Sequence, residues 1–258
     1  MYAMGSYLTA YTSSPWGAGQ FRPAVVVPAV FAALFGPVVG GVGAAVGTLI
    51  VDSIKHGFPY PPGLVASVPG NLVGFLFFGW LMKKEFSWGN FIRSSQITLL
   101  VSNAMTAFLY VYYRTFIEGF FPPAFKESWI YISLGFLAWW YVTMLPFMLL
   151  LGPPFIRAIA SAFPGLVSKE ISLSTIKSEA SRSSFSLAMI LPGIVMLAVG
   201  IMMTLADPSR IIELKLAQSP LILAGMQVLF VGSGLALLVL GSVTYLTGKT
   251  SVSIAQVR

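Results

Sequence analysis

Residues 35–52 read "FGPVVGGVGAAVGTLIVD", an apolar stretch that contains five glycines and one proline. Glycine and proline are poor residues for an isolated helix in water. In a membrane, small residues let helices approach closely where the hydrophobic effect no longer drives them together. The stretch therefore predicts a membrane helix that packs tightly through its glycines.

The composition of the whole chain is typical of an integral membrane protein. Of its 258 residues, 57% are hydrophobic, 14% are aromatic and only 9% are charged, whereas a soluble domain carries about 25% charged residues. The absence of cysteine excludes disulfides and thiolate metal sites. A single histidine, His56, excludes a multi-histidine metal site, so we expect no metal and no cofactor. The N-terminus lacks the basic region and cleavage motif of a signal peptide.

Apolar segments recur along the chain, and a helix needs roughly 20 such residues to cross the bilayer core. The segments are residues 2–11, 23–35, 37–54, 63–82, 95–117, 129–160, 185–205 and 219–246. The Gly36-Pro37 break leaves two interpretations of residues 23–54, one long kinked helix or a tight hairpin of two short helices, and we favour the hairpin. The sequence thus predicts an all-α membrane protein, with six segments that include short broken helices, followed by two C-terminal transmembrane helices.

One long polar stretch, residues 164–184, reads "PGLVSKEISLSTIKSEASRSS". Its mixed charge and many hydroxyl side chains are typical of a cytoplasmic linker. We therefore expect a membrane domain over residues 1–164, a linker over 165–184 and a two-helix tail over 185–258.

The net charge of +7 suggests either nucleic-acid binding or basic loops on the cytoplasmic side, and we favour the loops. If the chain begins inside and all eight segments cross, the inner side holds nine basic and three acidic residues, and the outer side six basic and five acidic. This distribution predicts a multi-pass protein of the cell membrane with both termini cytoplasmic, and no nucleic-acid partner.

The sequence from Phe35, "FGPVVGGVGAAVGTLIVDSIKHGFPYPPGLVASVPGNLVGFLFFGWLMKK", resembles the substrate-binding (S) component of energy-coupling factor (ECF) transporters. In that family a helix ends at Phe-Gly-Pro, and a glycine-rich helix that closes on an acidic residue, a Pro/Gly loop and another helix follow. Residues 145–164, "LPFMLLLGPPFIRAIASAFP", resemble the closing helix of the same six-helix fold. The resemblance covers roughly residues 20–164.

This resemblance implies uptake of a small molecule such as a vitamin, with a coupling membrane protein and ATPases as partners. Two features depart from the family pattern. The first segment has only about eleven residues, whereas the first helix of the family spans the membrane and docks on the coupling partner. The two-helix tail is also additional to the six-helix unit.

Small residues form two stripes on the glycine-rich helix. Gly36, Gly40 and Ala44 recur every four residues, as do Gly43 and Gly47. Such stripes favour close packing, either within the protein or against a sliding partner.

In the eight-crossing topology, polar and aromatic residues from four elements converge on the outer side, where the substrate pocket opens in the resembled family. Flat aromatic rings and oriented polar groups suit a small, partly aromatic, polar ligand. The candidate ligand-binding residues are Trp16, Asp52, Asn103, Tyr110, Tyr113, Arg114, Trp129 and Trp139.

Each candidate also has a plainer interpretation. Tyrosine and tryptophan near helix ends usually form the interfacial belt, and Asp52 could be solvated or paired. Asn71 and Asn103 could bond to neighbouring helices rather than to a ligand. A lone loop histidine such as His56 is more often solvated than bound to a metal.

The sequence contains no Gly-x-Ser-x-Gly, His-Glu-x-x-His or Gly-x-x-x-x-Gly-Lys motif, so we expect a non-enzyme without a nucleotide site of its own. Two functions remain open. The first is a substrate-binding subunit for uptake, energised by partner ATPases. The second is a structural or accessory subunit of a larger membrane complex that reuses the same fold. The glycine-rich core and the aromatic mouth favour the first, and the short first segment and the tail favour the second.

Overall fold

The computed structural model is helical throughout its regular elements. It describes residues 1–12, 14, 19–84, 86–121, 123, 126–168, 170–171, 182–209 and 220–255. The chain divides into two compact units, one formed by residues 1–11 and 20–175 and the other by residues 12–19 and 176–258. The division at 175/176 falls inside the stretch that the sequence marks as a linker.

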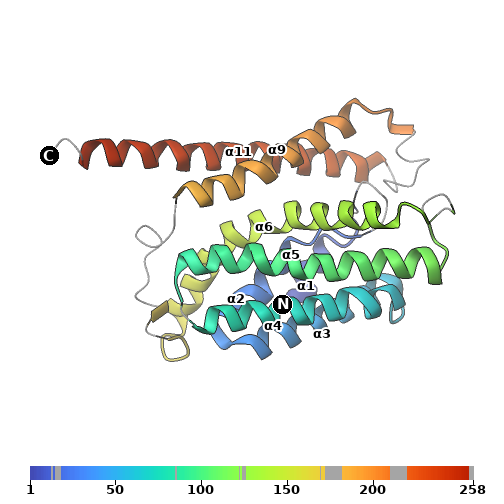
Figure 1. Cartoon of the computed structure of the whole chain (residues 1–258), viewed down its shortest axis with the longest axis horizontal. Coiled ribbons are helices and arrows are strands. Elements are labelled where there is room, and N and C mark those ends of the chain that lie inside the picture. Colours follow the sequence, from blue (N-terminus) through green and yellow to red (C-terminus); the bar gives the residue numbers. More distant parts are fainter. Residues whose placement is uncertain are drawn as a thin grey trace. The chain divides into compact units, whose positions relative to one another are not determined.

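The first unit is a helical bundle (Figure 1). α3, α4, α5 and α6 run side by side in it, each next to the following one. Its elements are α1 (Tyr2–Leu8), η1 (Pro23–Val25), α2 (Val26–Phe35), α3 (Pro37–His56), η2 (Gly63–Ser67), α4 (Val68–Lys84), α5 (Trp88–Tyr112), η3 (Tyr113–Ile117) and α6 (Trp129–Ala162).

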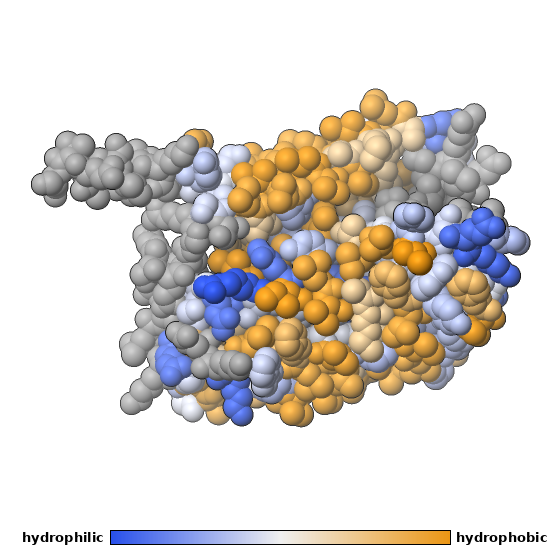
Figure 2. All heavy atoms as spheres, viewed as in Figure 1, coloured by the Kyte–Doolittle hydropathy of each residue, from blue (hydrophilic) through white to orange (hydrophobic). Residues whose placement is uncertain are grey.

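Five stretches among the described residues are long and apolar enough to cross a membrane, so the chain is a multi-pass membrane protein. They are Pro37–His56, Gly63–Lys83, Trp129–Ala162, Phe185–Leu205 and Leu223–Leu246. Apolar side chains cover much of the visible face of the first unit, and hydrophilic ones gather toward its ends (Figure 2). This distribution is the one that a lipid surround requires.

Two of the expected crossings are too short. α1 has 7 residues and α2 has 10, which at 1.5 Å per residue gives about 10 and 15 Å against a hydrocarbon core of about 30 Å. Neither helix can cross alone, which corrects the expectation of eight complete crossings. α5 is long enough at 25 residues, but it is more polar than the five apolar stretches.

Residues 23–54 form the hairpin and not a single kinked helix. Gly36 ends α2 with φ +93°, a left-handed backbone conformation that favours glycine, and Pro37 begins α3. α2 then packs back along α3 so closely that a Cβ on Gly40 would lie 2.2 Å from the Cβ of Ala32. Glycine at position 40 is therefore required by the contact itself.

The other small residues of α3 divide between packed and open positions. Ala44 is fully buried, and the ring of Tyr2 lies over Gly47, where an added Cβ would meet it at 2.6 Å. Gly43 is exposed with open space beyond its Cα. Gly43 thus departs from the expected stripe, because it packs against no other described helix.

The second unit contains the two tail helices, α9 (Arg182–Leu205) and α11 (Pro220–Ala255). Glycines bring them into close backbone contact, since an added Cβ on Gly234 would lie 2.6 Å from the amide nitrogen of Leu197. Gly193, Gly200 and Gly241 make similar approaches to the facing helix. The tail is therefore a tightly packed helical pair in its own right.

Candidate functional site

The hairpin brings a buried ion pair together. Arg22 lies fourteen residues before Gly36 and Asp52 sixteen after it, so the two arms of the hairpin end at nearly the same height. The Nη2 atom of Arg22 lies 2.5 Å from Oδ1 of Asp52. Arg22 is 7% exposed and Asp52 is 3% exposed. Buried charges in proteins are normally paired in this way.

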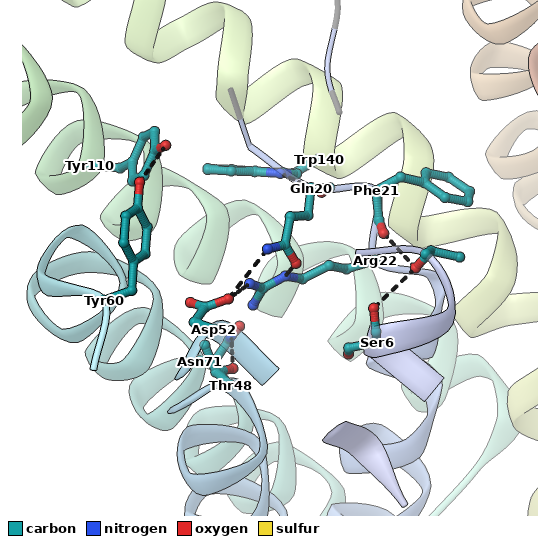
Figure 3. A network of polar contacts seen from close by, with 11 residues as sticks. Ser6, Gln20, Phe21, Arg22, Thr48, Asp52, Tyr60, Asn71, Tyr110 and Trp140 are labelled. Atoms are coloured by element: carbon teal, nitrogen blue, oxygen red, sulfur yellow. Dashed lines mark hydrogen bonds and ion pairs between the residues drawn. The ribbon is translucent and has the colours of Figure 1, made fainter. Parts of the chain in front are cut away.

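Gln20 completes the pair, as Figure 3 shows. Its side-chain oxygen accepts a hydrogen bond from Nε of Arg22 at 3.2 Å, and its amide nitrogen donates to Oδ1 of Asp52 at 3.4 Å. The segment that carries Gln20 and Arg22 is itself fixed from two sides. Trp140 of α6 donates to the carbonyl of Gln20 at 3.1 Å, and the hydroxyl of Thr9 donates to the carbonyl of Phe21 at 2.7 Å.

Gly63, the first residue of η2, lies between this ion pair and a second group of polar side chains. A Cβ on Gly63 would lie 2.5 Å from Oδ2 of Asp52 and 3.2 Å from the ring of Tyr60. Tyr60 stacks on His56, with ring centroids 3.9 Å apart, and its hydroxyl lies 3.4 Å from that of Tyr110 (Figure 3). Burial raises the pKa of the Tyr60 phenol well above its usual value, so Tyr60 remains a neutral donor.

α5 and the turn after it supply further buried polar groups. Asn103, Tyr110 and Arg114 are spaced seven and four residues apart, which places them on one helical face. Arg114 pairs with Glu118 at 2.5 Å and lies over the ring of Phe120, 3.4 Å from its centroid.

Two buried nitrogens on this face have no acceptor among the described residues. They are Nδ2 of Asn103, which is 4% exposed, and Nε of Arg114, which is 8% exposed. Because an unsatisfied buried donor is costly, each nitrogen marks a position where a ligand could accept a hydrogen bond.

The remaining candidates from the sequence lie elsewhere. Tyr113 is half-buried in η3. Trp129, the first residue of α6, makes edge-to-face contacts with Phe108, Tyr112 and Phe116. Trp139 is buried, but its neighbour Trp140 is the residue that contacts the ion-pair network. Trp16 lies outside the described residues.

Sequence reasoning did not select Gln20, Arg22, Tyr60 or Trp140 for the site. The signal for Arg22 was present, because a hairpin that turns at Gly36 places it opposite Asp52. Asn71 does bond to a neighbouring helix, since its Nδ2 donates to Oγ1 of Thr48 at 2.7 Å. This bond confirms the plainer interpretation of Asn71.

The side chains of this arrangement can bind a polar molecule through hydrogen bonds. Within the described residues, no group of three or more His, Cys, Asp and Glu side chains could hold a metal ion. The site offers the half-buried, neutral phenol of Tyr60 together with the buried amide of Asn103 and the buried guanidinium of Arg114, from three different segments of the bundle. No family model, no curated protein and no solved structure matches this chain.

Proposed function

We propose that this chain is the substrate-binding membrane subunit of an ECF-type uptake transporter, with a small polar molecule such as a vitamin as its substrate. The proposal rests on the sequence resemblance and on one structural observation. That observation is the pair of buried, unpartnered nitrogens of Asn103 and Arg114 on the face of α5 that also carries Tyr110.

The chemistry of these groups defines the ligand that would suit them. An amide and a guanidinium nitrogen both donate, so the ligand needs acceptor atoms such as carbonyl, carboxylate or ring nitrogen. The Tyr60 and Tyr110 rings add flat apolar surface beside them, which favours a ligand with an unsaturated ring. The energy for uptake would come from partner ATPases that act through a coupling membrane protein.

Mass spectrometry of the natively expressed protein in mild detergent tests this proposal. We expect the protein to co-purify with two ATPases and one coupling membrane protein, and to release a small organic molecule on denaturation. Arg114→Gln should lose that molecule even at temperatures well below its own unfolding midpoint. Arg93→Gln, which changes an exposed arginine on α5, is the matched control and should retain it. Release of the same molecule in equal amount from Arg114→Gln would refute the assignment of the site.

A structural subunit of a larger membrane complex is the second candidate, and a different observation favours it. The Arg22–Asp52 pair is satisfied by groups of the chain itself, including Gln20. A structural subunit needs buried charges whose hydrogen bonds are all made within the chain, as they are here. A ligand would then have no role at that pair. Co-purification with a stoichiometric set of membrane subunits that lacks ATPases, together with no released small molecule, would establish this alternative.

A further inference from the structure

A cavity of about 450 Å³ opens at the end of the first unit opposite the ion pair, where α2 turns into α3. This volume is within the range of sites for small organic ligands. Its walls come from the last turn of α2, the first turn of α3, the last turn of α4 and residues 168, 170 and 171. The lining includes apolar side chains, among them Phe35, Val38, Met82 and Phe86, and two charged ones, Lys83 and Glu170.

A close helix contact positions the lysine. A Cβ on Gly79 would lie 2.4 Å from Cα of Pro37, so α4 contacts the beginning of α3 backbone to backbone. Lys83 lies four residues after Gly79 and therefore on the same face of α4, one turn further along. The contact thus places Lys83, an exposed residue, in the wall of the cavity near the start of α3.

The start of α3 has no side-chain cap. Gly36 occupies the N-cap position and Pro37 follows it, and among the described residues no side chain makes a cap hydrogen bond to this end of α3. The positive end of a 20-residue helix therefore faces the same cavity as Lys83, since Gly36, Pro37 and Val38 all line it.

Lys83 and Glu170 do not neutralise each other. Neither makes an ion pair with any described residue. The cavity therefore presents a positive region, formed by Lys83 and the α3 terminus, together with a separate carboxylate and an apolar wall.

This pattern matches one class of molecule. We propose that the cavity holds a membrane phospholipid whose head group carries a phosphate and a primary ammonium. The phosphate would contact Lys83 and the start of α3, the ammonium would contact Glu170, and an acyl chain would follow the apolar side chains. Lys83 ends a candidate membrane span, which places the cavity at the depth of the lipid head groups.

Lipid retention by the full-length protein tests this inference. The protein is incubated in micelles with equal amounts of phosphatidylethanolamine, phosphatidylglycerol and phosphatidylcholine that have identical acyl chains, and native mass spectrometry counts the retained lipids. We expect the wild type to prefer phosphatidylethanolamine. Lys83→Gln should lower its retention about fivefold, the effect of one cation near a lipid surface. Glu170→Gln should abolish the preference over phosphatidylglycerol, and Arg93→Gln should change nothing.

Several results would overturn the inference. Equal retention of the three lipids by the wild type would show that the head group is not recognised. Equal losses in Lys83→Gln and Arg93→Gln would show general attraction to the basic end of the bundle. Displacement of the lipid by millimolar glycerophosphoethanolamine, which has no acyl chains, would show that the ligand is a soluble phosphate ester.

Discussion

Replacing Arg22 by methionine should destabilise the protein by about 3–5 kcal/mol, because the Asp52 carboxylate would remain buried without its cation. Coulomb's law gives the same order of magnitude. Both residues are less than a tenth exposed, so solvent screening is weak. Opposite unit charges about 4 Å apart attract by about 4 kcal/mol at an effective dielectric constant of about 20. Asp52→Asn should cost a similar amount, because it leaves the guanidinium unpaired.

The double variant Arg22→Met/Asp52→Asn distinguishes the energy of the ion pair from the energy of lost side-chain packing. It removes both charges, so its cost should fall below the sum of the single variants by about 2–3 kcal/mol. Unfolding of the detergent-solubilised protein by increasing dodecyl sulfate, followed by fluorescence of its 6 tryptophans, measures each free energy. Arg93→Met is the matched control and should cost less than about 0.5 kcal/mol. If the cost of the double variant equals the sum of the two single-variant costs to within about 0.5 kcal/mol, the two residues are not a buried, coupled pair.

Three further predictions concern packing, hydrogen bonding and pH. Gly40→Leu should destabilise by at least about 2 kcal/mol because α2 already touches that position, whereas Gly43→Leu should be tolerated, and thermal unfolding compares the two. Trp140→Phe should cost about 1 kcal/mol through its lost hydrogen bond, and unfolding of Trp139→Phe shows whether ring substitution alone has that effect. The raised pKa of Tyr60 keeps its phenol protonated in the folded protein at a pH where the phenol ionises in the unfolded chain. The free energy of unfolding should therefore fall as the pH rises above about 10. Unfolding measured at several pH values should show a weaker dependence for Tyr60→Phe.

The hairpin was predictable because its signal is local. Gly36-Pro37 combines a residue that tolerates a left-handed backbone with one that begins helices well, and both properties are visible in the sequence. Asp52 was selected from its position at the end of an apolar segment. Its partner Arg22 was not selected, although the two residues lie at similar distances from Gly36 along the sequence. In a hairpin that turns at Gly36, such spacing places them opposite each other.

Other parts of the site depend on three-dimensional detail that the sequence does not carry. Adjacent residues on a helix point about 100° apart, so the choice between Trp139 and Trp140 depends on the rotation of α6 within the bundle. The exposure of Gly43 has the same origin, because only the position of α3 among its neighbours shows which of its small residues meet another helix. Likewise, Asn71 has a partner in Thr48, whereas Nδ2 of Asn103 has none among the described residues, although both amides lie in apolar segments of the sequence.

The turn at Gly36 has a consequence for how this sequence can evolve. Inserting one residue anywhere between Arg22 and Asp52 would rotate the following part of its helix by about 100° and shift it by about 1.5 Å. Such a change would separate the ion pair and, in many positions, also the contact between Gly40 and Ala32. Related sequences should therefore accept many substitutions across residues 22–52 but almost no change in length, with loops elsewhere absorbing the insertions and deletions.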